Sequence, residues 1–291
     1  VKLKKSIKYN IKKGVENMEL FVTDLDGTLI NKDRQVTKKS EEIINELIKS
    51  GMNFTVATAR TPATAVEILQ NLDLKLPVAL MNGVLIYDTK ELKYIDIKDI
   101  NIESTYKILD IFEKYNKNPL VYGIVDNHLW VYHKEFEHAY EYNFYKERAD
   151  KELKTFVKIS NYKESVLKSS IINFVAFDEY EKIKSIAEEI EKIEGINVNY
   201  YKDVYEDCYF LEAYSSEASK ANGIKYLSKY INYKNVICFG DNLNDIPMFE
   251  LANEAYATAN ATEEVKKIAT GVIGSCEEEG VAEFLKERFQ N

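Results

Sequence analysis

Apolar and polar positions follow two rhythms along the first part of the chain. Three short runs are mostly apolar or β-branched, as in strands: residues 19–24, 53–58 and 77–81. Two longer segments between them repeat apolar residues every three or four positions, as in helices: residues 38–50 and 61–72. Strands that alternate with helices of this length predict parallel pairing with right-handed crossovers. Residues 19–81 therefore indicate the first half of a doubly wound sheet.

The rhythm changes at Asn82-Gly83, after which hairpins replace the crossovers. Turn signals predict hairpins over residues 84–97 and 120–133, the second turned at Asp126-Asn127. The helices expected in this region are at residues 102–115 and 179–193, and further strands at residues 156–159, 171–177, 197–201 and 209–213. A mixture of hairpins and helices predicts an α+β domain built on an antiparallel sheet.

The alternation of strands and helices then returns. It predicts helices at residues 220–230, 246–251, 262–268 and 280–289, and strands at residues 235–239, 254–258 and 271–273. Because these segments complete the first sheet, the middle region is an insertion. The predicted fold class is α/β: a Rossmann-like, doubly wound and mostly parallel core of residues 18–84 and 212–291, with an inserted α+β domain at residues 85–211.

Composition excludes several other classes of protein. Apolar residues make up 45% of the 291 positions, enough for a folded core, and only 11 glycines and 4 prolines occur, so no flexible linker is indicated. No uninterrupted apolar run exceeds four residues, whereas a membrane-spanning helix needs about 20. The formal charge of −9 would repel a nucleic acid. We therefore expect a soluble, cytoplasmic protein with no nucleic-acid or membrane partner.

The remaining local signals are weak. Residues 1–17 carry six lysines and one glutamate, and we expect them to form a flexible basic extension before the first strand. Three cysteines without metal-ligand spacing are expected to be buried free thiols: Cys208, Cys238 and Cys276. Three histidines spaced five apart share no helical face, which disfavours a metal site: His128, His133 and His138.

Two aspartates follow directly on the first strand. Asp24 and Asp26 are two residues apart, so in an extended backbone both side chains point to the same side at the carboxyl end of the strand. Open α/β sheets bind their ligands at that end. Two carboxylates this close repel each other unless a cation neutralises one of them or one retains a proton. The pair suits a nucleophile beside a general acid, with a divalent cation at the first.

A family resemblance rests on four segments in a fixed order: Asp24-Leu25-Asp26-Gly27-Thr28, Ala57-Thr58-Ala59-Arg60, Lys220, and Gly240-Asp241-Asn242-Leu243-Asn244-Asp245. Over residues 18–291 the chain resembles the haloacid dehalogenase-like hydrolase superfamily. The Asn82-Gly83 step and the place and size of the insertion are similar to its Cof-type phosphatase branch. In that branch an α+β cap lies between the threonine and lysine motifs, so residues 85–211 are expected to be a cap that sets substrate specificity.

The resemblance implies a site for phosphoryl transfer. Asp24 would attack a phosphoryl group to form an aspartyl-phosphate, and Asp26 would protonate the leaving oxygen and later activate water. Thr58 would donate a hydrogen bond to the phosphoryl oxygens, and Lys220 would neutralise Asp24 and the transferring group. These residue types suit the reaction because phosphoryl transfer spreads negative charge over three oxygens and needs cations and fixed donors around them.

The resemblance also implies a Mg²⁺ site. Asp241 would bind Mg²⁺ together with the Asp24 carboxylate and the Asp26 backbone carbonyl, and Asp245 would hold the waters of the metal. Hard oxygen ligands of this kind are the ones that Mg²⁺ prefers. Further contacts to phosphate or substrate are implied for four residues: Ala59, Asn82, Gly83 and Asn244. Ala59 stands where the branch usually has glycine, so we expect a somewhat different path for the loop after Thr58.

The expected substrate is a small phosphorylated metabolite, such as a sugar phosphate or a phosphorylated cofactor like pyridoxal phosphate. Two alternatives remain open: a phosphomutase that acts on hexose phosphates, and a non-catalytic metabolite-binding regulatory protein on the same fold. The sequence leaves the oligomeric state open as monomer or homodimer. Aromatic residues of the insertion could line a substrate pocket, although half-buried sheet positions are their default interpretation: Tyr122, Trp130, Tyr201 and Tyr209.

Overall fold

The computed structural model describes residues 18–202 and 207–290, and its chain divides into two compact units. The first unit comprises residues up to 57, residues 70–78 and residues from 224 onward; the second comprises residues 58–69 and 79–223. The basic extension predicted at residues 1–17 lies outside the described residues. The domain boundaries predicted from the sequence stay predictions.

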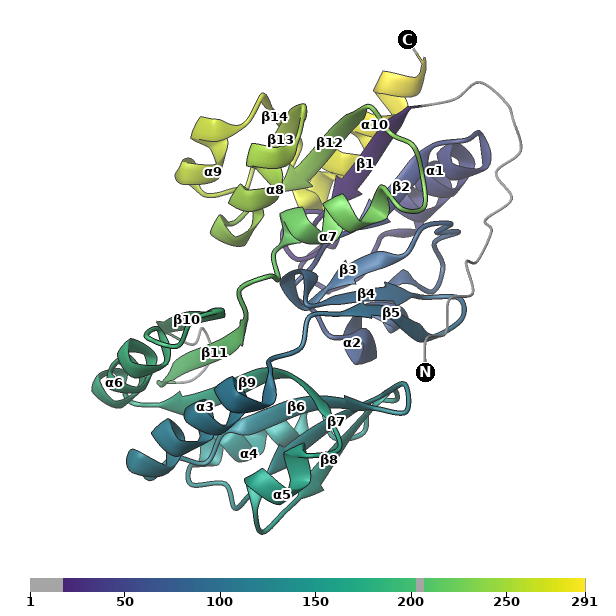
Figure 1. The fold of residues 1–291 in the computed structure, drawn as a ribbon. Helices are drawn as coiled ribbons and strands as arrows, with labels where there is room; N and C mark the ends of the chain where they lie inside the picture. The colour runs from purple at the N-terminus through teal and green to yellow at the C-terminus, as the bar shows by residue number, and fades with distance from the viewer. Residues whose placement is uncertain (1–17, 203–206, 291) are drawn as a thin grey trace. The chain divides into compact units, whose positions relative to one another are not determined.

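The first unit is built on a parallel sheet with the strand order β14-β13-β12-β1-β2 (Figure 1). Its strands are β1 (Glu19–Thr23), β2 (Asn53–Val56), β12 (Asn235–Gly240), β13 (Glu254–Thr258) and β14 (Gly271–Ile273), and its helices are α1 (Lys38–Lys49), α8 (Ile246–Leu251), α9 (Glu263–Ile268) and α10 (Gly280–Gln290). All four strand pairs are parallel. This is the Rossmann-like, doubly wound core that the alternation of periods predicts.

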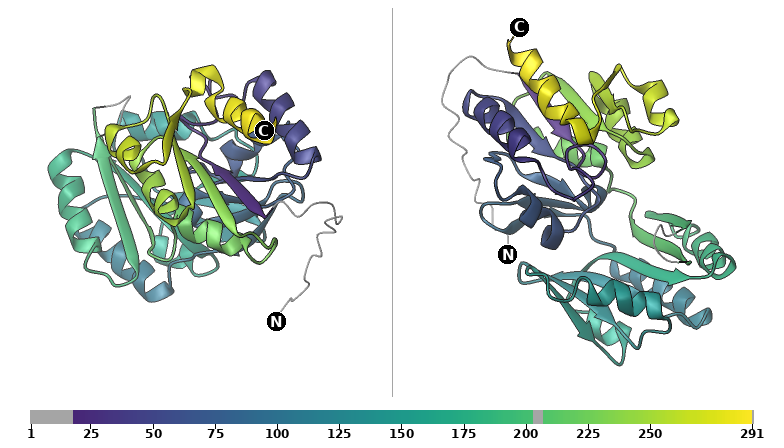
Figure 2. Two further views of the ribbon diagram at one scale, coloured as in Figure 1. Left: turned by 90° about the horizontal axis from the view of Figure 1, so that it is seen from above. Right: turned by 180° about the vertical axis from the view of Figure 1, so that it is seen from behind.

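Helices cover both faces of this sheet because the strand order runs outward from β1 and β12 in opposite directions. Right-handed crossovers then place α1 on one face and α8 and α9 on the other, and α10 lies beside α1 (Figure 2). Local sequence sets the ends of α1. The Thr37 side chain accepts a hydrogen bond from the backbone N–H of Ser40, and Gly51 with a φ of +109° follows its last turn.

The second unit holds the inserted α+β cap. Its strands are β4 (Leu85–Asp88), β5 (Lys93–Ile97), β6 (Leu120–Val125), β7 (His128–His133), β8 (Lys154–Lys158), β9 (Ser170–Asp178), β10 (Ile196–Lys202) and β11 (Tyr209–Ser215), and its helices are α2 (Pro62–Leu69), α3 (Ile102–Lys114), α4 (Ala139–Lys146), α5 (Tyr162–Val166) and α6 (Tyr180–Ile190). Two elements contribute residues to both units: β3 (Val78–Leu80) and α7 (Lys220–Leu227).

A six-stranded sheet with the order β10-β11-β9-β6-β7-β8 forms the body of the cap. Alternate residues of its strands bury one face against α3, α5 and α6, as shown by the shared hydrophobic core of Val121, Phe174, Leu211, Phe112 and Ile186. This core explains why apolar residues recur every three or four positions in the two long helices, α3 and α6. The neighbouring residues of each strand point to the opposite face of the sheet.

Two helices of the cap were absent from the sequence prediction, and one strand pairing differs from it. Aromatic residues, which favour helices only weakly, dominate α4, and the five residues of α5 are too few to show a period. The sheet predicted to be antiparallel contains one parallel pair, because α4 lies between β7 and β8 and provides the crossover that parallel strands need.

Smaller differences concern the edge of the core sheet and one cysteine. The third predicted strand, β3, belongs to a separate three-stranded sheet with β4 and β5. β3 contains only three residues. The residue before it, Pro77, contacts β2 because its carbonyl accepts a 2.7 Å hydrogen bond from Thr55 Oγ1. The helix predicted to reach residue 72 ends at Leu69. Cys208 and Cys238 are buried free thiols as predicted, whereas Cys276 is half-buried.

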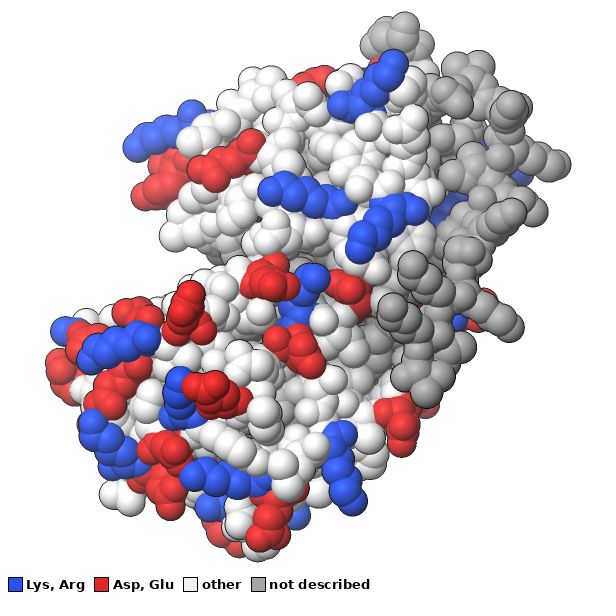
Figure 3. All heavy atoms as spheres, in the orientation of Figure 1, with Lys and Arg blue, Asp and Glu red and all other residues white. Residues whose placement is uncertain are grey.

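Among the described residues, no helix is long and apolar enough to cross a membrane. On the face drawn in Figure 3, acidic and basic side chains are interspersed over the described part of the surface. A mixed surface of this kind gives little net attraction for a phosphate backbone. The absence of a nucleic-acid partner stays a prediction.

Candidate active site

Three carboxylates meet in the first unit. Asp24, Asp241 and Asp245 each offer an oxygen, and these oxygens all lie within 4.8 Å of one another. Asp24 and Asp245 are buried and Asp241 is half-buried. Such a group of oxygen ligands could hold a metal ion, and it lies at the place where open α/β sheets bind ligands.

Pairing of two central strands brings Asp24 and Asp241 together from opposite ends of the sequence. β1 and β12 are parallel neighbours, so their carboxyl ends meet at the same edge of the sheet. The backbone N–H of Asp24 continues this ladder by donating to the carbonyl of Phe239, 2.9 Å. Asp241 follows directly on the last residue of β12. Both side chains therefore leave adjacent strands at the point where the ladder ends.

Asp245 shapes the loop that carries Asp241. One of its carboxylate oxygens accepts hydrogen bonds from the backbone N–H groups of Asp241, 2.9 Å, and Asn242, 3.0 Å. The Asp245 side chain also approaches Gly240 so closely that a Cβ there would lie 2.6 Å from the carboxylate carbon. The Asp245 carboxylate therefore holds the loop in a tight turn. The turn leaves no room for a side chain at position 240, which explains why a glycine precedes Asp241.

Gly27 and Thr28 position the Asp241 carboxylate from the other loop. Gly27 has a φ of +72°, and a Cβ at this position would lie 2.2 Å from Asp241 Oδ2. Thr28 Oγ1 donates a hydrogen bond to Asp241 Oδ1 at 3.2 Å. The carbonyl of Gly27 accepts hydrogen bonds from Thr258 Oγ1, 3.2 Å, and Asn260 Nδ2, 2.8 Å. Sequence analysis assigned no role to these four residues, although the Gly27-Thr28 dipeptide inside the aspartate motif was a visible signal.

Asp26 is not a member of the three-carboxylate group. The extended-backbone argument that paired it with Asp24 does not hold, because β1 ends at Thr23. The chain then turns at Leu25, whose carbonyl accepts hydrogen bonds from the N–H groups of three residues: Thr28, Leu29 and Ile30. The Asp26 side chain is exposed beyond this turn. Its proposed work as an acid and base therefore rests on the family resemblance rather than on strand geometry.

The second unit brings another set of predicted residues together. The Thr58 N–H donates to the carbonyl of Ala79, 2.9 Å, and the Thr58 carbonyl accepts from the N–H of Asn82, 2.9 Å. Asn82 adopts the left-handed conformation with a φ of 54°. Ala59 is exposed and, among the described residues, is not one of those with a positive φ. The threonine loop and the Asn82-Gly83 turn therefore form one hydrogen-bonded structure.

Lys220 begins α7 directly beside this structure. A Cβ at Gly83 would lie 2.1 Å from the carbonyl oxygen of Ser219, the residue before Lys220, so only glycine permits this approach. Lys220 is almost completely buried, with 1% of its surface exposed. Asn244, the remaining predicted contact residue, is exposed in the short 3₁₀ helix Leu243–Asp245 of the first unit.

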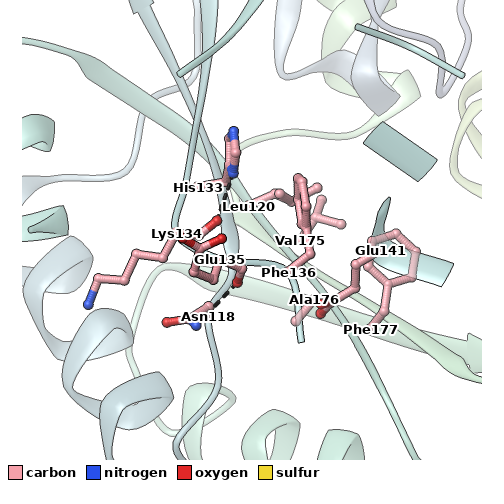
Figure 4. A pocket seen from close by; sticks show the side chains of 10 residues that line it. All are labelled: Asn118, Leu120, His133, Lys134, Glu135, Phe136, Glu141, Val175, Ala176 and Phe177. Atoms are coloured by element: carbon pink, nitrogen blue, oxygen red, sulfur yellow. Dashed lines mark hydrogen bonds between the residues drawn. The ribbon is translucent and has the colours of Figure 1, made fainter. Parts of the chain in front are cut away.

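A small pocket with room for about one water molecule lies in the cap (Figure 4). Its lining includes the parallel rings of His133 and Phe136, whose centroids are 4.7 Å apart, and residues of β9 such as Val175 and Phe177. His133 Nδ1 forms a 2.8 Å hydrogen bond with the carbonyl of Lys134, and burial lowers the pKa of this histidine. None of the residues predicted for the active site lines this cavity.

A second acidic group in the cap surrounds a buried lysine. Glu137, His138 and Asp178 offer ligand atoms within 4.8 Å of one another. The Lys117 ammonium, however, already lies 3.0 Å from Glu137 Oε2, 2.5 Å from Glu141 Oε1 and 3.4 Å from Asp178 Oδ2. The lysine therefore supplies the positive charge that these carboxylates need, and we interpret the group as structural. The three histidines of the prediction do not form a common cluster among the described residues.

Comparison with known proteins gives a family for this arrangement. A family model described as haloacid dehalogenase-like hydrolase matches residues 21–285. Two similar relatives come from Bacillus subtilis. Phosphatase YwpJ is 27% identical over 297 residues, which cover 92% of this chain and 99% of the relative. A 5-amino-6-(5-phospho-D-ribitylamino)uracil phosphatase is 24% identical over 274 residues, which cover 93% of this chain and 97% of the relative.

Solved structures share the fold. TM0651 from Thermotoga maritima superposes with a TM-score of 0.73 at 23% identity, covering 92% of this chain and 96% of that one. A phosphatase of the haloalkanoate (HAD) enzyme superfamily from Bacteroides thetaiotaomicron gives a TM-score of 0.73 at 18% identity, with 95% and 97% covered. These likenesses extend over both the core and the inserted cap.

Proposed function

The chain belongs to the haloacid dehalogenase-like hydrolase family, and from this premise we propose that it is a phosphatase acting on phosphate monoesters of small metabolites. The observation that carries the proposal is the meeting of the Asp24, Asp241 and Asp245 carboxylates within 4.8 Å. Relatives that align with nearly the whole chain are named phosphatases, which supports the same activity.

The donor chemistry of this group fits Mg²⁺. Mg²⁺ prefers oxygen ligands and keeps several of its waters, so a few carboxylates are enough to hold it. Three carboxylates this close repel one another unless a cation lies among them. We assign Asp24 and Asp241 as direct ligands, with the Asp26 carbonyl beside them. Asp245, which already accepts two backbone N–H groups, would hold the waters of the metal. When bound, Mg²⁺ would neutralise charge on the phosphoryl oxygens.

Asp24 is the proposed nucleophile. One of its carboxylate oxygens attacks phosphorus, the bond from phosphorus to the leaving oxygen breaks, and an aspartyl-phosphate forms on Asp24. Asp26 gives its proton to the leaving oxygen. In the second step Asp26 takes a proton from the water that attacks phosphorus, which restores the Asp24 carboxylate and releases phosphate. The exposure of Asp26 suits a group that must meet both a leaving group and water.

Thr58 and Lys220 are proposed to hold the transferring phosphoryl group. The Thr58 hydroxyl would donate a hydrogen bond to a phosphoryl oxygen, and the Lys220 ammonium would offset its negative charge. Lys220 is buried, and a charge interaction removed from water is stronger than one at the surface. Further phosphate or substrate contacts are proposed for Ala59, Asn82, Gly83 and Asn244.

The proposed substrates are sugar phosphates or phosphorylated cofactors such as pyridoxal phosphate. One relative that aligns over 97% of its length is named for a substrate with a phosphorylated ribityl chain, which supports a sugar-like leaving group. We further propose a cytoplasmic location and a monomeric or homodimeric state. These two points are independent of the mechanism.

Hydrolysis of p-nitrophenyl phosphate tests the proposal. We expect Mg²⁺-dependent release of phosphate by the wild-type protein, and a fall in kcat of about 10³-fold or more in Asp24→Asn, because the amide is not a nucleophile. Asp33→Asn, an exposed aspartate of the same unit, is the matched control and should retain wild-type activity. Equal turnover by Asp24→Asn and wild type would contradict the assignment of the nucleophile.

The same assays separate the two other functions. Isomerisation of a hexose phosphate without release of phosphate would favour a phosphomutase. Binding of a phosphorylated metabolite without turnover, at saturating Mg²⁺, would favour a regulatory protein on the same fold.

A further inference from the structure

Residues 258–262 take no part in the proposed reaction, yet they contact the three-carboxylate group. The segment begins at the last residue of β13, the parallel neighbour of β12. In the core sheet, β12 lies between β13 and β1 (Figure 1). This segment and the turn after β1 therefore leave the sheet on opposite sides of β12, whose last residue is followed by Asp241.

Two hydrogen bonds join the segment to the turn after β1. Thr258 Oγ1 and Asn260 Nδ2 both donate to the Gly27 carbonyl, at 3.2 and 2.8 Å. A carbonyl oxygen has two lone pairs, so these two donors satisfy it. The Thr258 side chain is buried, which excludes water as a substitute for its hydroxyl. Gly27 is therefore attached to a strand that does not neighbour its own in the sheet.

The same segment also holds the main chain of Asp241. The N–H of Thr262 donates to the Asp241 carbonyl at 2.9 Å. Gly27 and Thr28 in turn contact the Asp241 carboxylate. Residues 258–262 thus hold both the backbone of this aspartate and the turn against which its carboxylate lies. The position of the Asp241 oxygens relative to the turn after β1 depends on this segment.

Asn260 has a hydrogen-bond partner at each end of its amide. Its Oδ1 accepts a 3.1 Å hydrogen bond from the N–H of Cys276, which begins the 3₁₀ helix Cys276–Glu278 after β14. Its Nδ2 donates to Gly27. Because the oxygen faces an N–H and the nitrogen faces a carbonyl, one orientation of the amide satisfies both partners. This side chain therefore connects the chain segments that follow three strands: β1, β13 and β14.

We propose that Asn260 and Thr258 are positioning residues of the metal site, which hold the Gly27-Thr28 turn so that the Asp241 carboxylate keeps the orientation a divalent cation requires. The inference rests on the proposed Mg²⁺ site. Mg²⁺ demands nearly ideal octahedral geometry, so a small displacement of a ligand weakens its binding. Asn260 and Thr258 act through Gly27 and Thr28 and are not themselves metal ligands.

Calorimetric titration with Mg²⁺, in the absence of any substrate, tests the proposal. Asn260→Leu keeps the approximate size of the side chain and removes both the donor to Gly27 and the acceptor for Cys276. We expect the dissociation constant of Mg²⁺ to rise at least about 10-fold, because hydrogen bonds that orient a metal ligand typically contribute about 10- to 100-fold to metal affinity. The titration is made at 25 °C on folded protein.

Asn253→Leu is the matched control. Asn253 is also exposed and also joins two neighbouring parts of the core sheet, since its Oδ1 accepts a 2.8 Å hydrogen bond from the N–H of Val236. This bond lies at the amino ends of β12 and β13, the end of the sheet opposite the carboxylates. The variant should bind Mg²⁺ with the wild-type dissociation constant.

Thr258 provides a second pair of variants at the same carbonyl. Thr258→Val keeps the shape of the side chain and removes the hydroxyl, whereas Thr258→Ser keeps the hydroxyl. We expect the dissociation constant of Mg²⁺ to rise in Thr258→Val and to stay at the wild-type value in Thr258→Ser. Equal values in these two variants would show that the hydrogen bond to Gly27 does not set metal affinity, and the inference would be wrong.

The titrations separate the inference from the proposed function. If wild type binds no Mg²⁺, the proposed metal site fails and the inference fails with it. Equal affinities in wild type and Asn260→Leu would overturn the inference alone and leave the phosphatase function in place. A lower Tm in Asn260→Leu with an unchanged dissociation constant would show that Asn260 only supports the fold. If Asn260→Leu does not fold, the two Thr258 variants decide by the same titration.

Discussion

Gly27 is the residue at which backbone conformation and the geometry of the carboxylate group depend on each other most directly. Its φ of +72° disfavours any side chain, and a Cβ there would lie 2.2 Å from Asp241 Oδ2. We expect Gly27→Ala to lower kcat/KM for p-nitrophenyl phosphate by about 100-fold, because a displacement of the carboxylate by about 1 Å is enough for such a loss. Steady-state kinetics at saturating Mg²⁺ checks this.

Gly195→Ala separates the two causes. Gly195 also has a positive φ, +82°, but nothing lies within 4 Å of the position its Cβ would take. Both variants should lose about 1 kcal/mol or more of unfolding free energy from backbone strain. Only Gly27→Ala should lose activity. Similar activities in the two variants would show that the approach of Gly27 to Asp241 does not matter for catalysis.

At the level of elements, one arginine of α10 forms ion pairs with two strands of the core sheet. Arg288 Nη1 and Nη2 contact the two carboxylate oxygens of Glu254 in β13 at 2.7 and 2.8 Å, and Nη2 lies 2.8 Å from Glu19 Oε1 in β1. The hydrogen bond from Arg288 lowers the pKa of Glu254 to about 2. One side chain therefore links the C-terminal helix to two strands of the core.

Arg288→Met should destabilise the protein in a pH-dependent way. A carboxyl whose pKa is lowered on folding contributes stability above its unfolded value, about 4.5, and loses that contribution as the pH falls toward 2. We expect the variant to lose about 1 kcal/mol of unfolding free energy at pH 7 and to show a shallower acid decline between pH 4.5 and pH 2. Urea unfolding at several pH values measures both.

Lys286→Met, an exposed lysine of the same helix, is the control for loss of a positive charge. Its acid decline should match that of wild type. A decline of equal steepness in Arg288→Met would mean that the pair does not stabilise the folded state.

For the whole molecule, Mg²⁺ should act as a stabilising ligand. A ligand that binds only the folded state raises the unfolding free energy, by about 2.7 kcal/mol when its concentration is 100 times the dissociation constant. We expect the Tm of wild type to rise with Mg²⁺ concentration, and we expect Asp241→Asn to lose this response. Without Mg²⁺, the variant should be at least as stable as wild type, because one of three mutually repelling carboxylates is gone. Differential scanning calorimetry measures both effects.

Asp150→Asn, an exposed aspartate of the second unit, provides the comparison. It should respond to Mg²⁺ as wild type does. An equal rise of Tm in Asp241→Asn would indicate that Mg²⁺ stabilises the protein elsewhere than at the three-carboxylate group.

The order of strands and helices in the parallel core and the aspartate motifs could be read from local sequence. These signals act over distances of a few residues, so they can be recognised without the fold. They include a hydrophobic period of two or of 3.6 residues, a threonine before α1 and a glycine after it. Asp24 and Asp241 also follow strands that the sequence identifies, and the carboxyl ends of parallel neighbours must meet at one edge. The expected chemical roles of these residues came from the family resemblance, because the hydrophobic period of a segment says nothing about chemistry.

Only the tertiary structure decided which distant groups touch. The hydrogen bond from Thr28 to Asp241 joins residues 213 positions apart, and the parallel pairing of β7 with β8 depends on a helix whose aromatic residues hide its period. The burial of the Asn173 side-chain oxygen is likewise invisible in the sequence, where Asn173 is one polar residue in an apolar strand. Whether a polar group finds a partner depends on contacts across several strands, and these exist only after the chain has folded.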